Sequence, residues 1–424
     1  MNVIAASDSV GMRALLDGSW VAPEAIAAEV GRIIAEVRAR GDAAVVEYAR
    51  RFDDESFSIT KLRVPIPMLE TARSLLEPEI AAALELAKER IARFHRRQRQ
   101  PDVSYAEEDG TRYALERRPL CSVGVYAPQG AAVAVLACAM PAKIAGVKRV
   151  VVLSPPTKES LPAAVLFACA LSGVDELYAV GGAHAIAAAA FGTASIAPVH
   201  KIVGRGGLWT TEAKRQVFGR CGVDALAGPP EVLIVADDGA SSEYIVGELL
   251  AAAERPGTTR LAVLSESRPL LEAVAQLIDT LDPRALERNE FLDAAISTHC
   301  RLIEASTREE LLDVLNRFAP AYLSLQVRDP SAYLERVYAA GAVFVGDMTP
   351  MVSGEYLAGT SPVAPTSGTA RFTSALSLAD FTRTFSVIEN SAERVASDAT
   401  ALSALADFDG FPHHAQSARM RCGS

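Results

Sequence analysis

The chain has 424 residues, half of them hydrophobic and 22% charged, a composition typical of a folded protein with an ample core and two to three domains. Its net charge is −10 at pH 7, so we expect no nucleic acid as a partner. Six separated cysteines without a Cys-x-x-Cys pair favour the reducing cytosol. The longest apolar run, residues 131–139, is too short to cross a bilayer, and no signal peptide is visible, so we expect no membrane contact.

The first predicted elements are helical. Residues 1–22 are mixed in character and are predicted to form an N-terminal arm. From Pro23 to Arg51 the apolar residues recur at helical spacing, and Gly41 divides this stretch into two helices. Residues 67–98 form a further helical region.

The pattern then changes to short Val/Ile-rich runs, bounded by glycine or proline and separated by helical stretches. Such runs are typical of buried parallel strands joined by helices. The predicted strands are residues 123–126, 149–153, 176–180, 201–203, 231–236, 260–264, 302–304 and 342–345. They predict two α/β units, near residues 126–230 and from 231 to about 375. From residue 376 the pattern returns to helices and ends in a polar tail.

Two glycine loops follow predicted strands. Gly181-Gly182 opens a helix, where backbone N–H groups and the helix dipole suit an anion. The loop is not G-x-G-x-x-G and lacks the acidic residue that would hold a ribose, so a turn that needs glycine for steric reasons is the alternative. In the second loop, Gly204-Arg205-Gly206-Gly207, the guanidinium is suited to bind a phosphate or a carboxylate.

Several segments together resemble the histidinol dehydrogenase family. In chain order they include residues 123–128 (VGVYAP), 141–146 (PAKIAG), 181–192, 211–217 (TEAKRQV), 227–233 and 341–371, and the resemblance covers about residues 23–419. It implies an α/β fold with two incomplete Rossmann-like domains built on parallel sheets, plus an N-terminal arm and a helical C-terminal tail. It also implies a homodimer with exchanged tails. Family members use zinc to bind substrate and NAD to remove hydride twice from an amino alcohol.

The resemblance also implies a division of the chain. Residues 1–22 are the arm, and residues 23–125 together with 231–375 form the first Rossmann-like domain with the N-terminal helices. Residues 126–230 are an inserted second domain of nucleotide-binding type, and residues 376–424 are the dimerisation tail.

The family's zinc ligands are mostly replaced. The resemblance places a glutamine and a histidine at Ala252 and Arg255, an aspartate at Glu355 and a histidine at His414. Ala252 has no donor atom, and a guanidinium cannot bind a cation. We therefore expect no zinc site and predict that Arg255 forms an ion pair with Glu355 where the metal would lie. An Arg255 that points to solvent is the alternative.

The resemblance places Ala321 and Tyr322 where the family has its catalytic glutamate and histidine. It places Pro230 and Pro362 where the family has two polar residues that contact the substrate. The catalytic candidates that remain in the cleft are Tyr322, His184, Arg255, Glu355, Asp409 and His414. For NAD, which we regard as a possible cofactor, the candidate residues are Tyr126, Gly181, Gly182, His184, Gly206 and Gly207. His184 and Gly207 stand where the family has glutamine and asparagine.

These replacements favour a divergent, zinc-independent enzyme that acts on a small molecule. By default it is an NAD-linked oxidoreductase with an altered alcohol or amino-alcohol substrate, and not a true histidinol dehydrogenase. One alternative is a catalytically inactive pseudoenzyme that binds a ligand or a protein partner. The other is a non-redox enzyme that uses the same cleft.

Overall fold

The computed structural model describes residues 1–16, 22–157, 160–226, 228, 230–254, 260–281 and 289–421. The chain forms two units, one of residues 1–98 and 120–381 and one of residues 99–119 and 382–424, each described below by itself. None of the helices in the described ranges combines the length and apolar character that a membrane span requires.

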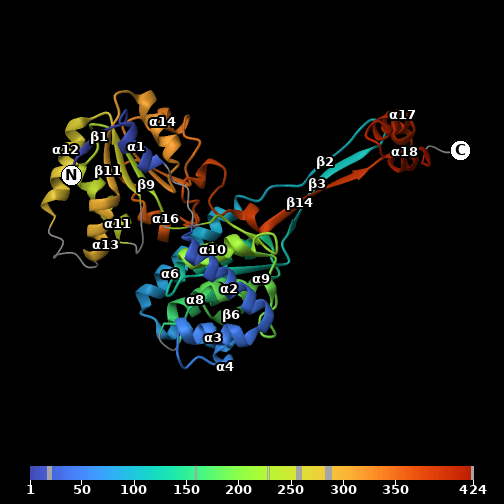
Figure 1. Ribbon diagram of the computed structural model, residues 1–424, viewed down its shortest axis with the longest axis horizontal. Coiled ribbons are helices and arrows are strands. Elements are labelled where there is room, and N and C mark those ends of the chain that lie inside the picture. The colour runs from blue at the N-terminus through green and yellow to red at the C-terminus, as the bar shows by residue number, and fades with distance from the viewer. Residues whose placement is uncertain are drawn as a thin grey trace. The chain divides into compact units, whose positions relative to one another are not determined.

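A six-stranded parallel sheet forms one half of the first unit (Figure 1). Its strands, in spatial order, are β1 (Val3–Ala5), β11 (Cys300–Glu304), β10 (Leu261–Ser265), β9 (Val232–Ala236), β12 (Tyr322–Gln326) and β13 (Ala342–Val345). Alternate side chains of β9 enter opposite cores. The helices of one core are α11 (Ser242–Ala253), α12 (Arg268–Thr280) and α13 (Asn289–His299), and those of the other are α1 (Ser9–Leu16) and α14 (Arg308–Phe318).

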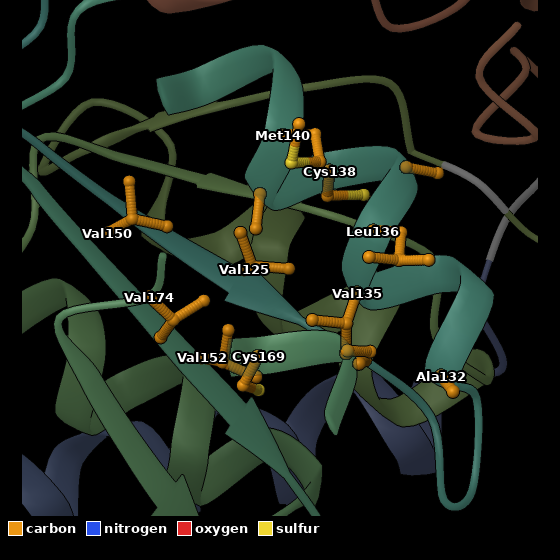
Figure 2. Close-up of a cluster of buried hydrophobic side chains, with 14 of the residues drawn as sticks. Val125, Ala132, Val135, Leu136, Cys138, Met140, Val150, Val152, Cys169 and Val174 are labelled. Carbon is orange, nitrogen blue, oxygen red and sulfur yellow. The ribbon is translucent and has the colours of Figure 1, made fainter. Parts of the chain in front are cut away.

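A five-stranded parallel sheet forms the other half of this unit. Its order is β6 (Glu176–Ala179), β5 (Arg149–Ser154), β4 (Ser122–Tyr126), β7 (Lys201–Val203) and β8 (Gly222–Val223). On one face, Val150 and Val152 pack with α7 (Ala132–Ala145) and α8 (Ala163–Ser172) (Figure 2). Helix α6 (Pro78–Arg96) belongs to the same core. On the other face, Val151 and Leu153 pack with α2 (Glu24–Arg40), α3 (Asp42–Phe52), α9 (Gly182–Phe191) and α10 (Leu208–Val217).

Short helices complete the first unit. They are α4 (Ile59–Leu62), α5 (Ile66–Thr71), α15 (Ser331–Leu334), α16 (Val352–Tyr356) and the 3₁₀ turns η1 (Ala72–Leu75), η3 (Thr369–Arg371) and η4 (Leu378–Phe381). Among them α16 matters for the site, because it carries Glu355.

The predicted fold class is confirmed, and all eight predicted strands are present. The structure groups the N-terminal segments differently from the predicted division. Residues 23–98 pack on the five-stranded sheet, because the apolar faces of α2, α3 and α6 complete its two cores. The predicted arm is part of the six-stranded sheet, where Val3 pairs with Leu302 and Met12 is buried.

The second unit is a three-stranded antiparallel ribbon that ends in two helices (Figure 1). The strands are β2 (Val103–Ala106), β3 (Arg112–Pro119) and β14 (Thr382–Glu389), and the helices are α17 (Ala392–Phe408) and α18 (Pro412–Arg419). The prediction of helices from residue 376 is therefore wrong for β14. This strand pairs with β3 along its whole length, and such a long-range partner leaves little trace in a half-polar sequence.

Candidate functional site

The two glycine loops lie at the carboxyl edge of the five-stranded sheet. The chain runs outward from β4 through β5 to β6 and then returns to place β7 on the other side of β4. Tyr126 ends β4 and Gly204 follows β7, so both stand where the strand order reverses. In open parallel sheets this reversal point is where ligands bind.

The first glycine loop joins β6 to α9. A Cβ on Gly181 would lie 2.6 Å from the Cβ of Pro155, and Gly182 has a φ of +65°. Both positions therefore need glycine for steric reasons, as the alternative prediction states. The Gly182 N–H donates to the Tyr126 hydroxyl at 3.2 Å, which joins two predicted cofactor residues at the start of α9.

His184 is buried in the core beside this loop. Its ring lies 5.9 Å from the ring of Tyr48 and 6.4 Å from that of Phe52, measured between centroids, and its Nε2 is 3.7 Å from the Asp53 carboxylate. Burial lowers the pKa of His184 to about 3, so the imidazole is neutral at pH 7. The structure does not bring His184 to the pocket that holds Tyr322 and Glu355.

A buried ion pair between Lys214 and Asp224 holds the second glycine loop. Lys214 Nζ donates to the Gly204 carbonyl at 2.9 Å, and the Gly204 N–H donates to the Asp224 carboxylate at 2.7 Å. A Cβ on Gly204, whose φ is +111°, would lie 2.1 Å from the Tyr126 carbonyl oxygen. The ion pair and this close approach together fix the backbone that precedes Arg205.

Arg205 contacts a carboxylate, as one reading of its loop predicted. Its Nη2 is 3.0 Å from Oε2 of Glu355, and its Nη1 is 3.5 Å from Oε1. Burial disfavours the charged guanidinium, but the Tyr322 hydroxyl and the Glu355 carboxylate outweigh it, so the pKa of Arg205 is raised above its ordinary value. Arg255, the predicted partner of Glu355, lies outside the described residues, and that pairing stays a prediction.

A small pocket lies beside Glu355 at the amino edge of the six-stranded sheet. It is lined by Pro230, Val232, Glu248, Ala251, Ala252, Tyr322, Met351, Val352 and Glu355. Its volume of about 20 Å³ is enough for one water molecule, and because the pocket is open on one side it can take the polar end of a larger molecule. The lining is mostly apolar, with two carboxylates and one phenol as its polar groups.

Tyr322 is oriented by the backbone of Pro362, which the sequence analysis had also placed in the site. Its hydroxyl donates to the Pro362 carbonyl at 2.9 Å, and its ring meets Phe344 edge to face at 5.7 Å between centroids. Ala321, the preceding residue, is fully buried. The ring is thus a fixed wall of the pocket, and the hydroxyl is hydrogen-bonded to the backbone.

The whole chain matches a known protein family. The match to histidinol dehydrogenase covers residues 20–422. The chain is 39% identical to histidinol dehydrogenase of Listeria monocytogenes serotype 4b, with 93% of this chain and 92% of the relative covered. It is also 39% identical to histidinol dehydrogenase of Rhodospirillum rubrum, with 97% and 96% covered. This chain belongs to the histidinol dehydrogenase family.

A solved structure agrees with this assignment. The crystal structure of histidinol dehydrogenase from Elizabethkingia anophelis matches with a TM-score of 0.92 at 26% identity, and the match covers 99% of this chain and 98% of that one. Both halves of the first unit and the ribbon unit thus occur within the family's known fold. The chain is a dehydrogenase of this family.

These comparisons correct the functional prediction made from the replaced positions. That prediction preferred an altered substrate, a non-redox reaction or no chemistry over histidinol oxidation. Relatives 38–39% identical over nearly the whole chain are named histidinol dehydrogenase and contradict it. The prediction judged the reaction from single replaced positions, whereas the similarity extends over nearly the whole chain.

The residues of this pocket do not fit the zinc ion that is usual in histidinol dehydrogenases. The Ala252 methyl group lines the pocket, and the Arg205 guanidinium already occupies the Glu355 carboxylate. No group of three His, Cys, Asp or Glu side chains that could hold a metal occurs in the part of the chain that the structure describes. A zinc site needs three or four such donors.

Two predicted residues belong to the second unit. Asp409 follows α17 and is exposed, and His414 lies on α18, where its ring stacks on Phe411 at 4.9 Å between centroids. Their roles as substrate and metal contacts stay predictions.

The prediction from sequence missed three charged residues of the site: Lys214, Asp224 and Glu248. All three are buried. Asp224 and Glu248 are isolated charges in otherwise apolar segments, a signal that could have found them, whereas Lys214 lies among the polar residues 211–217 and gives no such signal.

Removing Lys214 should destabilise the protein strongly. Lys214→Met leaves the Asp224 carboxylate buried without its cation, and we expect a loss of about 3–5 kcal/mol in the free energy of unfolding. Urea unfolding measures this loss. Lys148→Met, a change at an exposed lysine, should stay within about 0.5 kcal/mol of the parent. Equal effects of the two substitutions would contradict the role assigned to Lys214.

Metal analysis tests whether the protein lacks a bound zinc ion, as the residues of the pocket indicate. We expect the purified protein to retain less than about 0.2 zinc per chain after dialysis, because too few donors meet at the pocket. Elemental analysis by mass spectrometry gives the ratio. One zinc per chain that survives a chelator would show that residues outside the described ranges complete a site.

Proposed function

We propose that this chain oxidises histidinol, a cationic amino alcohol, with NAD as hydride acceptor. The observation that carries the proposal is its similarity to enzymes named histidinol dehydrogenase over more than nine-tenths of both chains. The pocket supports it, because Glu248 and Glu355 are carboxylates that attract an ammonium group. The net charge of −10 also favours the approach of a cation.

The carboxyl edge of the five-stranded sheet suits NAD. Two helices, α9 and α10, begin there after glycine loops, and helix N-termini bind the pyrophosphate of dinucleotides through backbone N–H groups. No atom lies within 4 Å of a Cβ built on Gly207, so the backbone at the start of α10 has open space beside it. Tyr126, bonded to Gly182, would border the same site. Bound NAD supplies the carbon that accepts a hydride.

The reaction sets three tasks for the chain's own residues. Each oxidation removes a hydride from carbon and a proton from oxygen, and two oxidations with one added water convert a primary alcohol into a carboxylate. The protein must hold the ammonium group, orient the carbinol carbon and accept protons. Glu355, which Arg205 holds in place, would supply a carboxylate near the ammonium group, and the fixed ring of Tyr322 would limit the orientations of the substrate.

An absorbance assay with histidinol and NAD tests the proposal. We expect two molecules of reduced cofactor for each histidinol consumed, because both oxidations take place on one substrate. A matched reaction without histidinol provides the control. Binding of NAD by calorimetry, with no reduction of the cofactor by histidinol, would contradict the proposed substrate.

We further propose that the chain forms a homodimer through its C-terminal tail. On α17, Leu402, Leu405 and Phe408 recur three residues apart, with 48%, 65% and 89% of their surfaces exposed. This spacing places them on neighbouring turns of one side of the helix. An exposed apolar stripe of this kind favours a protein contact, and a second copy of the chain is the occupant we propose.

Sedimentation should show a dimer that depends on this stripe. Leu405→Glu combined with Phe408→Glu should shift the protein to the monomer, because two charges cannot be buried against an apolar partner surface without cost. Thr400→Glu, an exposed position on the other side of α17, should leave the dimer intact. A parent protein that sediments as a monomer would refute the dimer.

A further inference from the structure

The two carboxylates of the pocket differ in their surroundings. Glu355 lies within ion-pair distance of Arg205, at 3.0 Å. Glu248 is only 9% exposed and accepts one backbone N–H, that of Met351, at 3.1 Å to each of its carboxylate oxygens. Among the described residues no lysine, arginine or histidine forms an ion pair with Glu248. Within the described ranges, the pocket therefore holds one carboxylate paired with a cation, Glu355, and one that forms no ion pair, Glu248.

The position of Glu248 is fixed from two sides. It lies on α11, one turn before Ala252, so both residues reach the pocket from the same face of the helix. The neighbouring Ile245 and Leu249 are fully buried in the core between α11 and the six-stranded sheet. The bond from Met351 ties the carboxylate to the residue that precedes α16. A group held in this way is preorganised toward whatever enters the pocket.

The other polar groups of the pocket are less suited to accept a proton. The Tyr322 hydroxyl donates its hydrogen bond to the Pro362 carbonyl. The Glu355 carboxylate is engaged by Arg205. Ala321, the residue that stands where a catalytic glutamate is expected from the resemblance, ends in a methyl group. Glu248 is the remaining base among the described residues that line the pocket.

We propose that Glu248 is the catalytic residue that accepts the proton of the substrate hydroxyl. This inference rests on the proposed oxidation of an alcohol by NAD. In the first step the carbinol carbon loses a hydride, with its two electrons, to NAD, the hydroxyl proton passes to the Glu248 carboxylate, and the C–O single bond becomes a carbonyl. The carboxylic acid then releases its proton to water, which regenerates the base. In the second step the hydrated aldehyde loses a hydride to a second NAD and a hydroxyl proton to Glu248.

The environment of Glu248 suits this task. Burial raises the pKa of Glu248, and the Met351 N–H lowers it only in part. A general base is most efficient when its pKa approaches the working pH. The ionised form is the active one, so turnover should rise as the pH increases through this pKa. In the part of the chain that the structure describes, the other charged or titratable groups that face the pocket are Glu355 with its partner Arg205, and Tyr322.

Glu248→Gln separates the chemical role from the structural one. The amide keeps an oxygen that accepts the Met351 N–H, so the turn before α16 should be preserved, while the basic group is lost. We expect kcat to fall about 100- to 10,000-fold, a much larger factor than any rise in the KM for histidinol, and the acidic limb of the pH profile to disappear. Glu254→Gln, at an exposed glutamate just beyond α11, is the matched control and should keep the parent kcat. Parent-like turnover and pH profile in Glu248→Gln would overturn the inference while the proposed function stands.

A second readout does not depend on turnover. Calorimetry of histidinol binding to the NAD-free protein, in two buffers with different heats of ionisation, counts the protons released. An ammonium group that arrives beside a partly protonated Glu248 should expel its proton at mildly acidic pH, and Glu248→Gln should abolish this release. Proton release that depends on Glu248, in a protein that does not oxidise histidinol, would refute the proposed function. It would still support the exchange of a proton by Glu248. Release that persists in Glu248→Gln would overturn the inference, and a protein that does not bind histidinol would refute both.

Discussion

The buried ion pair of Lys214 and Asp224 is the constraint on which the site depends. Both members also bond to the backbone of Gly204, so the pair closes a network around the point where the strand order of the five-stranded sheet reverses. A lysine buried to this degree is stable only because its ammonium group meets a carboxylate and two carbonyl oxygens. The same network sets the direction in which Arg205 leaves its loop. The position of Arg205 beside the pocket thus depends on the Lys214–Asp224 ion pair, although neither of these two residues lines the pocket.

Charge compensation explains the arrangement of the pocket. Arg205 reaches from the carboxyl edge of one sheet to Glu355 beside the other sheet, so one long side chain balances a carboxylate across the first unit. Because that balance is local, Glu248 stays without a cation among the described residues. A pair of carboxylates in unlike surroundings can divide the work between holding a cation and moving a proton.

Sequence patterns predicted most of the parallel strands, because Val/Ile runs such as 149–153 can be buried only between two helical layers, but they missed β1, β8 and β12. They also missed β14, whose alternating polar residues form a strand because the segment pairs with the distant strand β3. They did not single out Arg205 as a partner of Glu355, because local spacing does not show which side chains from distant segments approach one another. The predicted pairing of Arg255 with Glu355 lies outside the described residues and stays a prediction. The functional prediction gave too much weight to single replaced positions, such as Ala252 and Ala321, and too little to similarity along the whole chain.

The pairing of β3 with β14 has a consequence for folding during synthesis on the ribosome. Pro119 is synthesised about 260 residues before its partner Thr382, which at 5–20 residues per second is a delay of roughly 13–50 s. Throughout that time β2 and β3 can form only a hairpin, with one long edge unpaired. An exposed edge of this kind invites pairing with other chains. The free edge of β3 is therefore covered only when translation is almost finished.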